Sequence, residues 1–260
     1  MDIITSLENK KIKYINKLKS KKFRDEEGIF IIETKHLVEE AYKSGFLTEV
    51  YLLDTNIDSN ILEDDKINKY QITKEIMNKI SSLESPSNFL GLVKKLPTLN
   101  YGNRLLILDN IQDPGNLGTI IRSAVAFNLD TLILGNDCVD LYNDKTIRSS
   151  EGMLFKLNIL RKDLNAFLPE LKNNNYTIYG TNVVNGSIVG DIKFPKKYAI
   201  IIGNEGTGMK DCLKTLVDQN IYIPMSPNAE SLNAGIAASI IMYEMSRNDY
   251  EWLCMCRKNC

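Results

Sequence analysis

The feature that most constrains the fold is a strand, loop, helix and strand in succession, all within the 32 residues from Arg104 to Gly135. The apolar run RLLILD is followed by the loop NIQDPGNLG, by a helical pattern from about Asn116 to Phe127, and by a second apolar run, TLILG. Parallel strands need a crossover of this length, and that crossover is usually a helix. The pattern therefore predicts a βαβ unit, the building block of a parallel sheet with helices on its faces.

Further apolar runs extend the predicted sheet toward the C-terminus. They are LFKLNIL, YTIYG, YAIIIG and IYIPM, and helix-length patterns separate them. Strands that alternate with helices predict an α/β fold with a mostly parallel sheet. The last predicted helix, about Asn233 to Ser246, is apolar almost all the way round. Such a helix is typical of one buried between a sheet and another surface, such as a second subunit.

The N-terminal part of the chain has the pattern of a separate, smaller α/β domain. A helical pattern from about Ser6 to Lys19 is followed by short apolar runs that alternate with helix-length segments. Two polar stretches, SSLESPSN and KKLPTLN, then interrupt the pattern, as is usual between domains. We therefore predict two domains, residues 1–98 and 99–260.

Positive charge is concentrated near the N-terminus, although the chain as a whole has a net charge of −1. Seven lysines and one arginine fall between Asn9 and Arg24, with no acidic residue before Asp25. Such a cluster attracts a phosphate backbone, and the alternative is a solvated helix face. The residues that we assign to nucleic-acid binding are Lys10, Lys11, Lys13, Lys17, Lys21, Lys22 and Arg24.

Composition excludes several classes of protein. The densest apolar runs, such as Tyr198 to Ile202, are much shorter than the roughly 18 residues of a membrane-spanning helix. The N-terminus lacks the apolar run of a secretory signal, so we expect a cytoplasmic protein. The five cysteines do not form a disulfide framework. Since the C-x-C-x3-C tail is not a usual zinc pattern and His36 is the only histidine, we expect no metal.

Three predicted strands end in polar loops, and parallel strands bring these ends to one edge of the sheet. The first loop leads to Asn116 and Arg122, the second holds Glu205 among glycines, and the third leads to Ser231 and Asn233. Each has a structural alternative: Asn116 and Ser231 as helix caps, Arg122 as a surface cation, and Glu205 as an acceptor for loop amides. Their convergence predicts a functional site. The glycine order of the second loop, G-x-x-G-x-G, reverses the dinucleotide fingerprint and disfavours a nicotinamide-dependent oxidoreductase.

Taken in order, the segments DPGNLGTIIRSA, IIGNEGTGM and IPM with SLNAGIAAS resemble the three motifs of the SpoU (TrmH) family of RNA 2′-O-ribose methyltransferases, in the SPOUT superfamily. The opening TSLENKKIKYINKLKSKKFRDEEGIFIIE resembles the RNA-binding domain, similar to ribosomal protein L30e, that precedes the catalytic domain in many members. The resemblance covers nearly the full chain and is strongest from Leu105 to Glu244. It implies a C-terminal α/β domain with a trefoil knot, preceded by a small L30e-like α/β domain.

The resemblance also implies a reaction, the transfer of a methyl group from S-adenosylmethionine to a ribose 2′-hydroxyl of RNA without a metal. The positions that match the family's catalytic set are Asn116, Arg122, Glu205, Ser231 and Asn233. The positions that match its cofactor contacts are Thr181, Gly203, Ile223 and Leu232. It further implies a homodimer with the sites at the interface, in agreement with the apolar last helix.

The residue types suit this chemistry. Because a guanidinium stays protonated at neutral pH, we expect Arg122 to orient the 2′-hydroxyl or its adjacent phosphate, with Asn116 and Glu205 fixing the arginine. The basic N-terminal segment suggests recognition of a folded RNA. Because the N-terminal arrangement resembles that of ribosomal RNA modifiers, the resemblance implies ribosomal RNA as the substrate, with 23S rRNA first. The alternatives are a tRNA 2′-O-methyltransferase and a non-catalytic RNA-binding scaffold, and the complete catalytic set argues against the scaffold.

Overall fold

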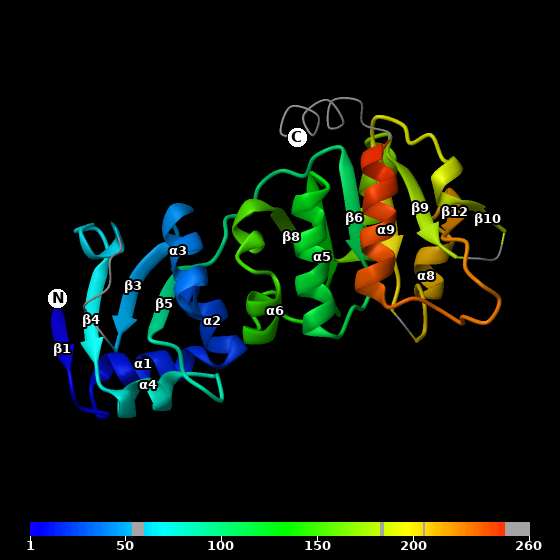
Figure 1. The fold of residues 1–260 in the computed structure, drawn as a ribbon. Helices are drawn as coiled ribbons and strands as arrows, with labels where there is room; N and C mark the ends of the chain where they lie inside the picture. The colour runs from blue at the N-terminus through cyan, green and yellow to red at the C-terminus, as the bar shows by residue number, and fades with distance from the viewer. Residues whose placement is uncertain (54–59, 183–184, 205, 248–260) are drawn as a thin grey trace, which may run out of the picture. The chain divides into compact units, whose positions relative to one another are not determined.

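The computed structural model describes residues 1–53, 60–182, 185–204 and 206–247 (Figure 1). The chain forms two compact units. The first contains Met1–Pro97 together with Asp140–Phe155, and the second contains Thr98–Val139 and the chain from Lys156 on. Asp140–Phe155 follows a strand of the second unit and yet packs within the first. Nothing in the described ranges is a helix long and apolar enough to cross a membrane.

The first unit is built on a five-stranded sheet with the order β1-β4-β3-β5-β2. Neighbouring strands are parallel, except that β5 runs antiparallel to both β2 and β3. The strands are β1 (Asp2–Ile4), β2 (Ile29–Glu33), β3 (Leu47–Leu52), β4 (Asn68–Ile72) and β5 (Phe89–Lys94). The helices are α1 (Lys10–Leu18), α2 (Lys21–Glu27), α3 (Lys35–Lys43), η1 (Asn60–Leu62), α4 (Lys74–Ile80), α6 (Asp144–Ser149) and η2 (Met153–Lys156).

Helix α1 shows how the sequence places its basic face outward. Asn9 caps the helix by accepting the backbone N–H of Lys11 at 2.9 Å, so the helix begins later than the periodicity predicts. Ile12, Ile15 and Leu18 are completely buried in the core of the first unit. Because these residues recur at helical spacing, the lysines between them lie on the solvent side.

The second unit is built on a seven-stranded sheet with the order β10-β12-β9-β11-β6-β7-β8. All of its strand pairs are parallel, which confirms the predicted α/β fold with a mostly parallel sheet. The strands are β6 (Arg104–Leu108), β7 (Thr131–Gly135), β8 (Asn158–Lys162), β9 (Thr177–Thr181), β10 (Gly186–Ile188), β11 (Tyr198–Ile202) and β12 (Gln219–Tyr222). The helices are α5 (Pro114–Ala126), α7 (Leu164–Asn173), η3 (Val189–Asp191), α8 (Asp211–Lys214) and α9 (Ala234–Arg247).

The packing and the strand order of the second unit indicate where it can bind a ligand. Leu105 and Ile107 of β6 pack in one cluster with Leu168 of α7 and Leu213 of α8. Helices α5 and α9 lie side by side against the sheet (Figure 1). In sequence order the chain moves from β6 to β7 on one side, whereas β11 lies on the other side of β6. Open parallel sheets bind ligands beyond the carboxyl ends of their strands at such a change of direction.

Candidate active site

Helix α5 begins at Pro114, and its cap is Asp113. The carboxylate of Asp113 accepts the backbone N–H of Asn116 at 2.8 Å. The alternative that Asn116 caps the helix is therefore wrong. Instead, the side-chain oxygen Oδ1 of Asn116 accepts a 2.9 Å hydrogen bond from Nδ2 of Asn233, so the first and third motifs meet.

Asn233 performs two tasks at the start of α9. Its Oδ1 accepts the backbone N–H of Gly235 at 2.9 Å and of Ile236 at 3.3 Å, which is the geometry of a helix cap. Its Nδ2 makes the bond to Asn116. The helix cap is thus Asn233, and the alternative that Ser231 caps this helix is wrong. Ser231 is exposed two residues earlier.

Helices α5 and α9 run parallel and in register. Beyond the asparagine pair at their first turns, the hydroxyl oxygens of Ser123 and Ser239 lie 2.7 Å apart. Near the last turns, the rings of Phe127 and Tyr243 meet edge to face with centroids 5.8 Å apart. Contacts at the first turns, in the middle and near the last turns thus hold the two helices side by side.

Arg122 is exposed on α5. Among the described residues, no hydrogen bond or ion pair joins its guanidinium to another side chain, so the expected contact with Asn116 is not formed in this structure. Glu205, the other expected partner of Arg122, lies outside the described residues. Among the described residues, the five N–H donors of the Arg122 guanidinium thus have no side-chain acceptor.

Strand β11 continues into a loop of residues 203–210, which we call the glycine loop. A side chain at Gly203 would place its Cβ only 2.3 Å from the carbonyl carbon of Gly208 and from the backbone nitrogen of Met209. The loop closes through two backbone hydrogen bonds between Asn204 and Gly208, of 3.1 and 2.9 Å. Glycine is therefore required at residue 203 by the close approach of the backbone.

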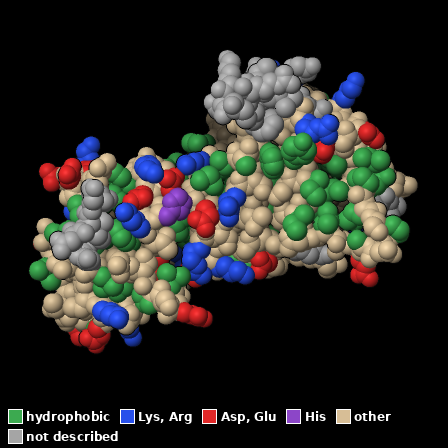
Figure 2. All heavy atoms as spheres, in the orientation of Figure 1, with side chains coloured by type: hydrophobic (Ala, Val, Ile, Leu, Met, Phe, Trp, Pro, Cys, Tyr) green, Lys and Arg blue, Asp and Glu red, His purple; other side chains and the backbone are tan. Residues whose placement is uncertain are grey.

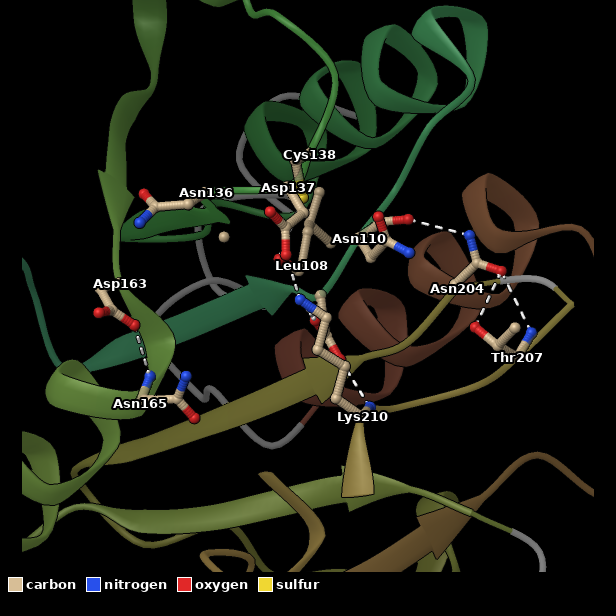
Figure 3. A network of polar contacts seen from close by, with 12 residues as sticks. Leu108, Asn110, Asn136, Asp137, Cys138, Asp163, Asn165, Asn204, Thr207 and Lys210 are labelled. Carbon is tan, nitrogen blue, oxygen red and sulfur yellow. Dashed lines mark hydrogen bonds and ion pairs between the residues drawn. The ribbon is translucent and has the colours of Figure 1, made fainter. Parts of the chain in front are cut away.

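The glycine loop is anchored at its beginning by the side chain of Asn204 (Figure 3). Its Nδ2 donates to the carbonyl oxygen of Asn110 at 2.9 Å. Its Oδ1 accepts the backbone N–H groups of Gly206 at 2.9 Å and Thr207 at 3.2 Å. One side chain thus ties the loop both to itself and to the end of β6.

The end of the glycine loop is anchored by Asp109, a carboxylate that is 1% exposed at the end of β6. It accepts the backbone N–H of Lys210 at 2.8 Å, and the Lys210 ammonium lies 3.8 Å from its other oxygen. The ammonium also pairs with Asp137 (Figure 3). This hydrogen bond with Asp137 raises the pKa of Lys210 above its usual value, against the opposing effect of burial. Sequence reasoning missed both anchors, although Asp109 ends the apolar run RLLILD.

A cavity of about 320 Å³ opens beside the glycine loop, and all four predicted cofactor positions line it. They are Thr181, Gly203, Ile223 and Leu232. Ser231 of the predicted catalytic set lines the same cavity, whereas Asn233, two residues later, is not among the lining residues. The hydroxyl of Thr181 donates to the carbonyl oxygen of Ile201 at 3.0 Å, which fixes the end of β9 against β11. The ends of β9, β11 and β12 thus form one site.

Comparison with known proteins decides the family. The family model described as "SpoU rRNA Methylase family" matches residues 103–243, which is more than half of the chain. The chain belongs to the SpoU rRNA methylase family. A second model, described as "MRM3-like substrate binding domain", matches residues 9–91 of this SpoU family member.

Relatives of this SpoU family member extend over both units. A 23S rRNA (guanosine(2553)-2′-O)-methyltransferase of Bacillus subtilis, RlmP, is 37% identical over 94% of this chain and 99% of its own. An uncharacterised tRNA/rRNA methyltransferase of Synechocystis is 29% identical over 95% of this chain and 94% of its own. The crystal structure of an AdoMet-bound rRNA methyltransferase from Sinorhizobium meliloti superposes with a TM-score of 0.84 at 25% identity, covering 95% of this chain and 98% of that one.

The predicted RNA-binding lysines of this SpoU family member lie on α1 and α2. Those that are exposed are Lys10, Lys13, Lys17, Lys21 and Lys22. Lys11 is half-buried, because its ammonium pairs with Glu49 at 3.0 Å and lies 4.6 Å from the ring centre of Tyr70. It has less freedom to reach a phosphate than the exposed five.

Arg24 requires a correction. It is only 9% exposed, and its guanidinium donates to the carbonyl oxygens of Leu18 and Lys19 at 2.9 and 2.8 Å. It also pairs with Asp140 at 2.6 Å. Arg24 therefore holds the α1–α2 junction to the segment Asp140–Phe155 rather than facing solvent. The basic run faces outward through its lysines alone.

No metal centre is visible within the described ranges, where no three His, Cys, Asp or Glu side chains form a group that could hold an ion. Cys138 is buried, and burial raises the pKa of its thiol. Its Sγ donates to the carbonyl oxygen of Leu108 at 3.2 Å. The tail residues Cys254, Cys256 and Cys260 lie outside the described residues.

Proposed function

We propose that this chain is an S-adenosylmethionine-dependent RNA 2′-O-ribose methyltransferase that acts on ribosomal RNA, with 23S rRNA as the favoured substrate. The observation that carries the proposal is the single cavity lined by Thr181, Gly203, Ile223 and Leu232 beside the bonded pair of asparagines from motifs one and three. The relative named as a 23S rRNA 2′-O-methyltransferase, aligned over 94% of this chain, supports the choice of substrate.

The cavity fits the cofactor by size and by lining. Its volume of about 320 Å³ is within the range of roughly 300–1,000 Å³ that small-molecule sites occupy. Ile223 and Leu232 offer apolar surface for an adenine ring, while Asn182, Asn204 and Ser231 offer polar groups at the same cavity. When bound, S-adenosylmethionine supplies a methyl group that its sulfonium has already activated. The chain's own task is to position the acceptor hydroxyl and to stabilise charge on it.

Arg122 is the group that we assign to the acceptor. Its guanidinium is exposed and unpaired among the described side chains, so its planar donors can hold the ribose 2′-oxygen or the adjacent phosphate. The positive charge of a guanidinium at this position stabilises negative charge that develops on the 2′-oxygen. We assign Asn116 and Asn233 to positioning of α5 and α9, and Glu205 and Ser231 to the same site by their match to the family motifs.

The proposal includes a homodimer formed through α9. Ile236 and Tyr243 on this helix are 51% and 46% exposed, although most of its other apolar residues are buried. Hydrophobic side chains gather over the same part of the molecule in Figure 2. An exposed apolar patch of this kind is typical of a subunit interface. The proposal also includes three expectations from the sequence. They are a trefoil knot in the C-terminal domain, a domain boundary at residue 98 and a cytoplasmic location.

The test is transfer of tritiated methyl from S-adenosylmethionine to unmodified total RNA, fractionated into 23S rRNA, 16S rRNA and tRNA. We expect label in 23S rRNA, and we expect Arg122→Ala to abolish it. Label in tRNA alone would keep the chemistry and overturn the choice of substrate. A protein that binds S-adenosylmethionine but labels no RNA, including immature ribosomal particles, would contradict the proposed activity and favour an RNA-binding scaffold.

A further inference from the structure

The first unit contains a cavity of its own, of about 190 Å³. It is lined by the α1–α2 junction, by β2, by the end of α4 and by α6 with the residues before it. Every lining residue belongs to the first unit. This volume is below the roughly 300 Å³ at which sites for drug-sized ligands begin, so the cavity suits one small group rather than a whole cofactor.

One part of the cavity is aliphatic. Leu18 and Ile80 are completely buried, Ile147 is nearly so, and Ile31 is half-buried at the wall. Side chains of this type offer flat apolar surface but no hydrogen bonds. A free inorganic anion would gain nothing from such walls, whereas a planar ring would bury its faces against them.

The other part of the cavity carries cations. Lys19, Arg24 and Arg148 line it, and the guanidinium of Arg148 reaches from α6 to the loop after α4. Its Nη1 donates to Asp144 at 2.9 Å and to the hydroxyl of Ser82 at 3.3 Å. Its side chain remains 34% exposed. Since a guanidinium has five N–H donors, Arg148 keeps donors for a further acceptor.

The two carboxylates that line the cavity are already engaged. Glu33 is 5% exposed and accepts the backbone N–H and the hydroxyl of Ser82, both at 2.7 Å, as well as the hydroxyl of Ser81. Asp144 is paired with Arg148. Of the three cations, Arg24 is paired with Asp140. Lys19 uses two of its three donors on the carbonyl oxygens of Lys79 and Ser81, so Lys19 and Arg148 are the cations with donors left for an anionic group.

We propose that this cavity receives one unstacked nucleotide of the RNA substrate, with the base against the aliphatic wall and its phosphate on Arg148 and Lys19. Proteins recognise RNA largely through unstacked bases held against side chains. Exposed Lys17 directly precedes Leu18 of the lining, and exposed Lys21 and Lys22 follow Lys19 by two and three residues, so cations near the cavity can hold the neighbouring phosphates. The inference deepens the proposed function and rests on RNA being the substrate.

The test compares three variants of the full chain by their Kd for an unmodified 23S rRNA transcript. Ile31→Trp fills the cavity, Arg148→Ala removes its exposed cation, and Lys74→Ala removes one exposed lysine of the same unit that does not line the cavity. We expect Ile31→Trp, which excludes the base, and Arg148→Ala, which removes a phosphate contact, each to raise the Kd about tenfold. We expect Lys74→Ala to change it less than about twofold.

Two further measurements keep the outcomes distinct. The Kd for S-adenosylmethionine and the thermal midpoint should match those of the wild type in all three variants, which excludes a folding defect. Titration with the four nucleoside 5′-monophosphates should detect weak binding to the wild-type chain that Ile31→Trp abolishes. If Ile31→Trp and Arg148→Ala bound the transcript as tightly as Lys74→Ala does, the proposal that the cavity binds a nucleotide would be wrong. If the wild-type protein transferred no methyl group, the proposed function would be wrong instead. The binding data would still show whether the cavity receives a nucleotide.

Discussion

Nδ2 of Asn233 donates to Oδ1 of Asn116 across 2.9 Å, which joins two side chains 117 positions apart in the chain. The same Asn233 caps α9 through Gly235. One side chain therefore fixes both the start of α9 and its position beside α5, and the contact between Ser123 and Ser239 continues the register about two turns further. The cavity beside the glycine loop is lined in part by α9, so this bond acts on the geometry of the proposed active site.

Replacing Asn233 separates its two tasks. Asn233→Ala removes both, so we expect loss of about 1 kcal/mol of unfolding free energy, the usual cost of a lost cap, together with a fall in methyl transfer. Asn233→Ser keeps a capping oxygen but is too short to reach Asn116. It should regain most of the stability and little of the activity. Urea unfolding and methyl transfer measure the two effects, and wild-type turnover in Asn233→Ser would show that the bond to Asn116 is dispensable.

Arg122 is expected to contribute to turnover and not to stability. Because it is exposed and unpaired among the described residues, Arg122→Ala should leave the free energy of unfolding within about 0.5 kcal/mol of the wild type. It should lower kcat by about 100-fold, as loss of a donor to developing charge does. Arg122→Lys should recover little, since an ammonium lacks the planar fork. Near-normal turnover in Arg122→Lys would rule out an orienting role.

The anchors of the glycine loop are expected to control cofactor affinity. Asn204→Ala frees the loop from Asn110, and Asp109→Asn removes the buried charge that faces Lys210. Each should raise the Kd for S-adenosylmethionine about tenfold, which corresponds to about 1.4 kcal/mol. Asp211→Asn is the matched control, because Asp211 is exposed and pairs with Lys214 outside the loop. Calorimetric titration measures the affinities, and equal values for all three variants would show that the anchors do not shape the cavity.

The sheet of the second unit could be predicted from sequence because its central strands β6, β7 and β11 are buried almost throughout. Runs such as RLLILD and YAIIIG are continuous and apolar, as parallel strands are, and the structure pairs them along their full length. The cap of α5 was misjudged although a signal was present. Pro114 occupies the first helical turn, and proline there places the cap at the residue before it, Asp113.

Arg24 shows what periodicity does not reveal. In the sequence it is one more cation in a basic run, and its partner Asp140 is 116 positions away. Nothing in the local pattern indicates that the segment Asp140–Phe155, which follows β7, packs within the first unit. Contacts between segments so far apart depend on the tertiary structure, and they decide which member of a basic run turns inward.

We therefore expect Arg24 to contribute more to the free energy of unfolding than the exposed lysines next to it in the sequence. The Arg24 and Asp140 side chains are 11% and 17% exposed and lie 2.6 Å apart. Removing one partner leaves the other buried and unpaired, so Arg24→Ala should lower the free energy of unfolding by about 3 kcal/mol. Asp140→Asn should also destabilise the protein. Exposed Lys21, in contrast, should tolerate Lys21→Ala within about 0.5 kcal/mol.

For RNA affinity, we expect Lys21→Ala to have a larger direct effect than Arg24→Ala, the opposite of their effects on stability. Lys21→Ala removes a cation that can meet a phosphate, so the Kd for an rRNA transcript should rise and its dependence on salt concentration should become shallower. Arg24→Ala should affect RNA affinity only through the loss of folded protein, and the salt dependence of the remaining folded fraction should match the wild type. Chemical unfolding and RNA titration at several salt concentrations measure both. If Arg24→Ala made the salt dependence shallower at unchanged stability, Arg24 would be a phosphate contact after all, and its ion pair with Asp140 would have to open when RNA binds.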